Sequence, residues 1–297
     1  MIRNLTIINN KNEKTSISLS NPSESGLLIT NIDGLDAPVG QVNMIERNLL
    51  NGDVFNGSRA NGRNIVLTIR YHENNINLDS VEDIRHKVYR IFPIGEKITL
   101  IVTTDTREVY FEGYVETNVV NIFSQQEESQ VSILCENSYG QGKSENTDSF
   151  SGIESAFEFP FSNESLSDAL IEFGNLYTVY AKMVDSESEA RTGFVTTISF
   201  KESVSGVTIA NATTGQKMML NGSYSNGDVL EISTIQGDKY VKLNGNNALG
   251  SWYTNSSNEW VELMNGDNYI SITNGAGQET MVNSIITIEY PVLYMGV

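Results

Sequence analysis

The chain has 297 residues, of which 39% are hydrophobic, and a formal net charge of −18. At about 150 residues per domain this length predicts two domains, and the lack of a basic cluster argues against a nucleic-acid partner. No apolar run approaches the roughly 18 residues of a spanning helix, so we expect no membrane partner. Residues 1–10 are too polar for a secretory signal.

Residues 39–63 hold many apolar side chains between Asn-Gly pairs. A projecting hairpin of this composition would promote aggregation of a monomer, because unpaired edges and apolar patches recruit partners. We therefore expect an oligomer interface here, with the alternative that these side chains complete the core of their own domain. The residues concerned are Val42, Met44, Ile45, Leu49, Leu50, Val54 and Phe55.

The segment that follows predicts strands around one helix. In residues 64–71, Ile65, Leu67 and Ile69 share one face of a strand. A helix is expected from Val81 to Phe92, since its apolar residues recur at helical spacing, Ser80 can cap it and a proline stops it. Further strands are expected at 97–103, 108–115 and 130–136. The pattern is typical of a scaffold rather than of a catalytic domain.

The second half predicts antiparallel β structure. Eight Asn-Gly pairs suit type I′ hairpin turns, and short β-branched runs recur as in a sandwich. We expect a first domain at 1–140, a polar linker at 141–150 and a second domain at 151–297. Residues 166–173 fit a helix or a strand. Other strands are expected at 195–201, 207–210, 217–220, 229–233, 240–243, 260–263, 269–273 and 284–290.

Catalytic and metal-binding patterns are weak in this sequence. His86 lies beside Arg85 and Lys87, which is typical of a solvated helical face, and neither His86 nor His72 accompanies a Gly-x-Ser-x-Gly turn. The histidines and Cys135 have no zinc spacing, and the acids form no calcium loop. We expect no catalytic residue, no metal and no cofactor. A lone cysteine forms no intrachain disulfide, which suits a reducing cytoplasm.

The tryptophans raise the alternative of a glycan site. Trp252 and Tyr253 lie in a loop-like segment, and Trp260 begins an expected strand. Exposed indoles stack on sugars, whereas the simpler interpretation is that they close the end of a core. Alternation sends Val261 and Leu263 inward, which leaves Trp260 as the better sugar contact and Trp252 as the cap. We expect no tight sugar binding, because one aromatic platform without clustered polar groups orients a glycan poorly.

Ten motifs in order along the chain resemble the distal tail protein family of long-tailed, non-contractile bacteriophages (siphophages). They are NIVLTIRY (64–71), VYRIF (88–92), YFEGYVE (110–116), VSILCENSY (131–139), NATTGQKM (211–218), NGDVLEI (226–232), VKLNG (241–245), WVEL (260–263), GDN (266–268) and ITIEY (286–290). Each motif alone is weak, but the ordered set covers nearly the whole chain.

The resemblance implies a structural protein of the tail-tip baseplate, assembled in the host cytoplasm. It implies a homo-hexameric ring that joins the major tail tube protein to the tail-associated lysin or hub protein and to receptor-binding proteins, with a channel through which DNA passes. The first domain, a β-barrel or sandwich with one α-helix, would form the ring. The second would be a peripheral galectin-like or carbohydrate-module-like β-sandwich. No enzymatic activity is implied.

Two other classes stay open from the residues alone. A carbohydrate-binding module for host adhesion would require exposed indoles and measurable glycan binding. A β-rich cell-wall hydrolase would require acids converging in a cleft. If the protein forms a ring, some first-domain acids are expected to line the channel, because carboxylates repel phosphates within about 8 Å at physiological salt.

Overall fold

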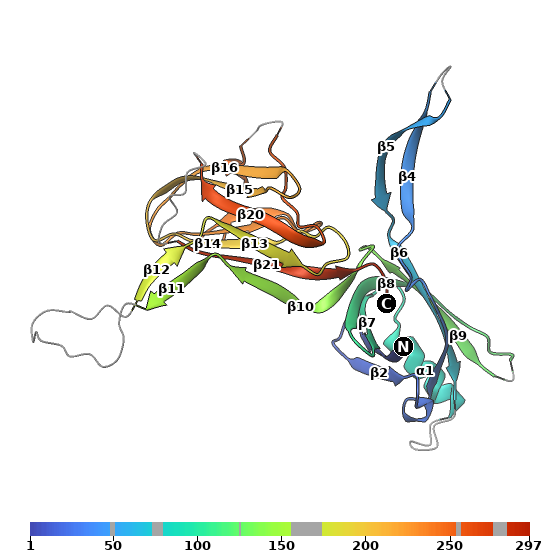
Figure 1. Ribbon diagram of the computed structural model, residues 1–297. Helices are drawn as coiled ribbons and strands as arrows, with labels where there is room; N and C mark the ends of the chain where they lie inside the picture. Colours follow the sequence, from blue (N-terminus) through green and yellow to red (C-terminus); the bar gives the residue numbers. More distant parts are fainter. Residues whose placement is uncertain (48–50, 73–79, 125, 156–173, 254–256, 276–283) are drawn as a thin grey trace, which may run out of the picture. The chain divides into compact units, whose positions relative to one another are not determined.

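The computed structural model describes residues 1–47, 51–72, 80–124, 126–155, 174–253, 257–275 and 284–297. These residues form strands β1 to β21, the α-helix α1 (Val81–Ile91) and two 3-10 helices, η1 (Pro22–Glu24) and η2 (Leu249–Ser251). The chain divides into two compact units (Figure 1), namely Met1–Lys143 with Leu293–Val297, and Ser144–Val292. The mainly β fold class predicted from the sequence is confirmed.

The first unit contains an antiparallel sheet in the order β2–β1–β7–β8–β9–β6–β3. Ile65, Leu67 and Ile69 of β6 are fully buried, so the alternation predicted for this strand is confirmed. Their burial against the other inward faces forms one hydrophobic core. The strands are β1 (Ile2–Ile8), β2 (Lys14–Ser18), β3 (Leu27–Asp33), β6 (Arg63–Tyr71), β7 (Lys97–Thr104), β8 (Glu108–Val120) and β9 (Glu128–Cys135).

Helix α1 covers this core with one apolar face. Ile84 and Val88 are fully buried, and Phe92 follows the last helical residue as its C-cap. The hydroxyl of Ser80 accepts from the backbone N–H of Asp83, whose carboxylate accepts in return from the backbone N–H of Ser80. This reciprocal capping satisfies two helix-end donors, which is why the helix begins at Val81.

The second unit is a sandwich of two antiparallel sheets around a second core. One sheet has the order β10–β21–β14–β17–β18–β19 and the other β13–β20–β15–β16, while β11 and β12 form a separate pair. The strands are β10 (Gly140–Ser149), β11 (Ser151–Ser155), β12 (Gly174–Thr178), β13 (Ala181–Ser186), β14 (Val195–Ser199), β15 (Val204–Asn211), β16 (Gln216–Tyr224), β17 (Val229–Ser233), β18 (Tyr240–Leu243), β19 (Asn246–Asn247), β20 (Gly266–Asn274) and β21 (Ile285–Tyr294).

The polar stretch expected as a linker is strand β10. Its Gln141 and Gly142 pair with β8, and its later residues belong to the second unit, beside β21. Backbone ladder bonds hold this strand, and such bonds are invisible in a composition of small polar residues. Leu293–Val297, expected in the second domain, group with the first unit. The segment 166–173 lies outside the described residues.

Residues 260–263 alternate as predicted, but they do not form a strand. Val261 and Leu263 are fully buried, whereas only Leu263 makes a β-bridge, to Thr192. Two buried amides replace the missing ladder. Asn211 donates to the carbonyl of Glu262 at 2.8 Å, and Asn268 donates to that of Met264 at 2.7 Å. Side chains that satisfy the backbone in this way are not predictable from hydrophobic periodicity.

The Asn-Gly pairs are less uniform than expected. Asn244 and Gly245 both have positive φ, as a type I′ turn between β18 and β19 requires. In contrast, Asn56-Gly57 and Asn221-Gly222 lie inside strands β5 and β16. Gly57, at φ 132°, lies where the register of its hairpin shifts, so this pair marks a β-bulge rather than a turn.

Candidate functional site

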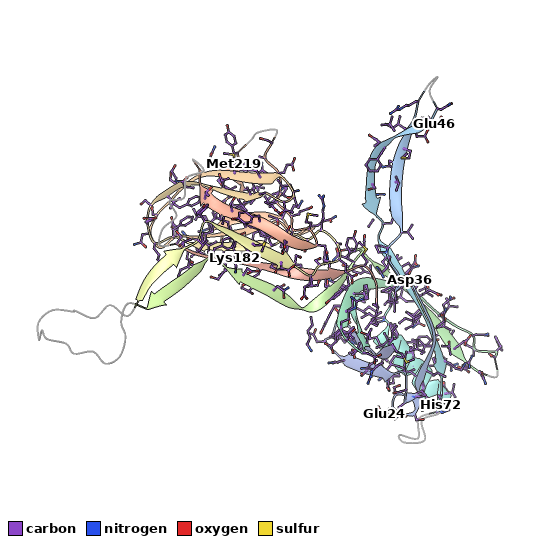
Figure 2. The ribbon with its side chains drawn as sticks, in the orientation of Figure 1. Glu24, Asp36, Glu46, His72, Lys182 and Met219 are labelled. Carbon is purple, nitrogen blue, oxygen red and sulfur yellow. The ribbon has the colours of Figure 1, made fainter. Side chains whose placement is uncertain are left out.

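The most unusual surface of the first unit is a two-stranded hairpin, which we call the arm. It consists of β4 (Gly40–Glu46) and β5 (Asp53–Ala60), which among the described strands pair only with each other. All seven residues of β4 are exposed. The arm leaves the sheet between β3 and β6 (Figure 1), and Glu46 lies near its far end (Figure 2). An isolated two-stranded hairpin is marginally stable in water, so the arm needs support from elsewhere.

Apolar side chains cover both faces of the arm. Met44 and Phe55 are direct cross-strand partners and therefore share a face, on which Val42 also lies. Ile45 and Val54 form the corresponding pair on the opposite face. Exposure is 58% for Val42, 52% for Met44 and Ile45, 38% for Val54 and 59% for Phe55. These side chains are thus outside the core of their own unit. Leu49 and Leu50 lie outside the described residues.

A buried arginine, Arg63, holds the base of the arm. It is 5% exposed and donates to the carbonyl oxygens of Gly34 at 2.9 Å, Ser138 at 3.0 Å and Met295 at 2.7 Å. Its guanidinium carbon also lies 5.0 Å from the ring centroid of Phe111. Burial lowers the pKa of Arg63, yet a guanidinium stays charged at any physiological pH. Arg63, which follows the arm, therefore links three segments: the one before the arm at Gly34, the one after β9 at Ser138 and the C-terminal one at Met295.

The C-terminal segment also contacts the chain that leads into the arm. The backbone N–H of Val297 donates to the carbonyl of Leu35 at 3.2 Å. Arg107 donates to the carbonyl of Gly296 at 3.3 Å and lies 4.5 Å from the ring centroid of Tyr294. Residues 293–297 thus complete the base of the arm, although they are more than 200 positions away in the sequence.

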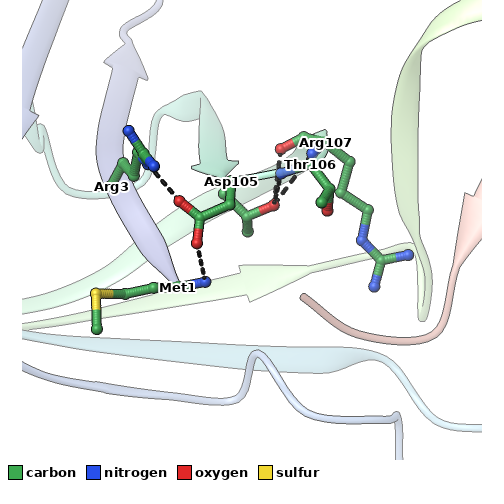
Figure 3. Close-up of polar contacts among 6 residues, drawn as sticks. Met1, Arg3, Asp105, Thr106 and Arg107 are labelled. Atoms are coloured by element: carbon green, nitrogen blue, oxygen red, sulfur yellow. Dashed lines mark hydrogen bonds and ion pairs between the residues drawn. The ribbon is translucent and has the colours of Figure 1, made fainter.

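The β7–β8 turn orients Arg107 and fixes the N-terminus. Figure 3 shows Asp105 between the N-terminal ammonium group, at 2.8 Å, and the guanidinium of Arg3. These two donors lower the pKa of Asp105. The Thr104 hydroxyl accepts from the backbone N–H of Arg107 at 3.2 Å. Because this ion-pair cluster is exposed, we interpret it as a turn anchor of small energetic effect.

The tryptophans of the alternative glycan site pack on each other. The ring centroids of Trp252 and Trp260 are 4.5 Å apart, and both half-buried side chains contact the second core. Lys239 lies 5.6 Å from the centroid of Trp260, and Tyr253 is 38% exposed. Each indole covers part of the other, so the surface left for stacking on a sugar is small.

Groups suited to catalysis or metal binding do not converge in the described part of the chain. His86 is exposed on α1, 3.8 Å from Glu82, and His72 is exposed after β6. Burial raises the pKa of the Cys135 thiol to about 11, which suppresses its thiolate. Within the described ranges, no three His, Cys, Asp or Glu side chains gather as metal ligands. The same residues include no helix of the length and hydropathy needed to cross a membrane.

Arg63 was missed by the sequence reasoning, although a signal was available. It shares the inward parity of Ile65, Leu67 and Ile69, so strand alternation already placed a charge on the buried face. A charged residue on a core face needs partners and therefore marks a position of structural importance.

Comparison with known proteins identifies the domain type of the second half. Residues 187–291 match the family model described as siphovirus-type tail component, C-terminal domain. A search of curated proteins gives no match. The resemblance to the distal tail protein family is therefore confirmed at the level of this domain.

Solved structures extend the likeness to the whole fold. The chain is similar to the crystal structure of the SPP1 Dit protein, described as a paradigm of hub adsorption apparatus in Gram-positive infecting phages, at 10% identity with a TM-score of 0.64, covering 98% of this chain and 99% of that one. A chain of the phage P2 baseplate in its activated conformation with Ca gives 10% identity and a TM-score of 0.44, covering 100% of both chains. At 10% identity, the similarity to SPP1 Dit shows a shared fold and no more.

Proposed function

We propose that this protein, a phage tail component by its matched domain, forms a hexameric ring at the tail tip through its arm. The observation that supports the ring is the exposed apolar surface on both faces of the arm. Such a surface is unfavourable in water and is covered when another copy packs on it. A contact between two different surfaces of neighbouring copies forms a closed ring when the rotation that relates successive copies adds up to a full turn.

The ring would join the tail tube protein to the hub or tail-associated lysin and to receptor-binding proteins. Support comes from the whole-length fold similarity to SPP1 Dit, whose structure is described as a paradigm of hub adsorption apparatus. In this proposal the protein is structural, without enzymatic activity or cofactor. It would be assembled in the host cytoplasm and would be located at the tail tip of the virion.

The charge distribution bears on the proposed DNA channel. The first unit has 13 basic and 18 acidic residues, a net charge of −5, whereas the second has 6 and 19, a net charge of −13. Most of the negative charge is therefore outside the proposed ring-forming unit. A DNA channel would depend on where first-unit acids such as Glu112 and Glu116 lie. An inner wall dominated by Lys and Arg in a structure of the ring would rule the channel proposal out.

Native mass spectrometry of the full chain tests the ring directly. Six chains of 32.8 kDa give a mass of about 197 kDa. A hexamer that dissociates only under conditions that weaken apolar contacts is the expected result. A protein that stays at 32.8 kDa at micromolar concentration would contradict the proposal.

For the second unit we predict no tight glycan binding. Titration of the full chain with bacterial cell-wall polysaccharide should give a Kd no lower than about 1 mM, because the stacked indoles leave one small platform with few oriented polar groups around it. Isothermal calorimetry is the measurement. A micromolar signal that disappears in Trp260→Ala would instead support the carbohydrate-adhesion alternative.

A further inference from the structure

A second exposed apolar surface lies where β8 connects to β9, and we call it the tip. It comprises Val119, Ile122 and Phe123, which are 63%, 52% and 101% exposed. Residues 119–124 carry no charged side chain. Full exposure of a phenylalanine among apolar neighbours, without charges to keep the surface hydrated, is typical of a contact surface rather than of a solvated turn.

The tip borders a hollow large enough to receive an aromatic side chain. The hollow has a volume of about 450 Å³ and is lined by Thr68, Val119, Val120, Asn121, Glu128 and Gln130. Its acidic member, Glu128, already faces Arg70 at 3.6 Å. An apolar side chain that entered the hollow would therefore leave no unpaired carboxylate behind.

The tip and the arm lie at opposite ends of the same strand pair. In the β6–β9 register, Arg63 at the base of the arm is paired with Cys135, and Arg70 is paired with Glu128 beside the tip. Seven residue steps separate these pairs, which is about 23 Å at 3.3 Å per residue. The arm also extends away from β9 in Figure 1. One copy therefore cannot place its arm on its own tip, and a contact between them must join two copies.

We propose that the arm of one copy docks on the tip of the next, with the face that carries Val42, Met44 and Phe55 against the hollow. This inference rests on the ring proposed above and names the acceptor surface that such a ring requires. The docking face has charges only at its far end, at Glu46 and Asp53, and residues 119–124 have none. The carboxylate of Glu128 in the hollow is paired with Arg70, so docking covers an ion pair rather than a lone charge. Two different surfaces on each chain make the contact head-to-tail, as a ring needs.

A mixing experiment with two variants tests this pairing. Met44→Asp/Phe55→Asp removes the docking face, and Ile122→Asp/Phe123→Asp removes the tip. Each variant alone should be a 32.8 kDa monomer. Mixed at equal concentrations, they should form one dimer of about 66 kDa, since the intact arm of one meets the intact tip of the other. Gln126→Glu is the matched control, because it adds a charge to the same connection outside residues 119–124, beside the charged Glu127, and it should leave the hexamer intact.

The outcomes separate this inference from the ring itself. A tip variant that remains hexameric overturns the inference and leaves the ring standing. Two monomeric variants that do not combine also overturn it, because the tip would then contact something other than the arm. A monomeric wild-type chain overturns both proposals.

A cross-linking measurement covers the case of a variant that misfolds. In a Cys135→Ser background, Phe55→Cys and Phe123→Cys in one chain should form disulfides between copies under mild oxidation. Links should be reduced at least about tenfold when either introduced cysteine is absent. Equal linking by the Phe55→Cys chain alone would indicate arm-to-arm contact and overturn the inference.

Discussion

Replacing Met44 and Phe55 together by aspartate is expected to convert the assembled protein into a folded monomer. Each of these side chains contributes about 1.5–3 kcal/mol if it is fully buried in an interface, and an aspartate placed there adds the cost of an unpaired buried charge. Loss of several kcal/mol at each contact of the proposed ring would shift assembly by more than about a thousandfold in concentration. Light scattering across a dilution series measures the change.

The fold should survive these substitutions, because both side chains lie outside the core of the first unit. Far-ultraviolet circular dichroism and the urea midpoint should therefore match those of the wild-type chain measured as a monomer. Asn43→Asp, on the face of the arm opposite to Met44 and Phe55, is the control. If the double variant assembles like Asn43→Asp, the arm is not the interface; if it unfolds, these side chains support their own domain instead.

Replacing Arg63 by methionine should lower the free energy of unfolding of the first unit by at least about 3 kcal/mol. The change would leave the carbonyls of Gly34, Ser138 and Met295 without a charged donor. Arg63→Lys should recover only part of the loss, because an ammonium group is a point charge and cannot span three acceptors as the planar guanidinium does.

Cys135 provides the measurement. Its thiol is buried, with a pKa of about 11, and its residue is the strand partner of Arg63. An unfolded cysteine has a pKa near about 8.5 and reacts readily at pH 8. The rate at which a thiol reagent labels Cys135 across a urea series therefore reports opening of the first unit without an introduced cysteine.

Arg70→Met is the matched control for Arg63→Met. It removes the same charge from the same strand, but Arg70 is on the outer face, where it pairs with Glu128 at 3.6 Å and 38% side-chain exposure. Such a pair contributes less than about 1 kcal/mol. If the two substitutions lower the free energy of unfolding by similar amounts, the buried Arg63 stabilises the first unit no more than the exposed Arg70 does.

The sequence by itself determined those helices and strands whose hydrophobic side chains recur at helical or strand spacing. The inward face of β6, the start of α1 at its capping box and most strands of the second unit follow from periodicity and local chemistry alone. The apolar composition of residues 39–63 by itself also indicates a projecting hairpin. These signals are local, so they can be read from neighbouring residues.

Only the tertiary structure decided what depends on contacts between distant segments. β10 is a strand because of backbone bonds to β8 and β21, and residues 260–263 are held by amides from Asn211 and Asn268. Hydrophobic periodicity along the chain does not indicate such hydrogen bonds between distant segments. The base of the arm is set by Arg63 and by a C-terminal segment that returns to the first unit. The sequence thus indicates that an apolar hairpin projects, whereas the fold decides where it is anchored and which surface lies at the opposite end of the sheet.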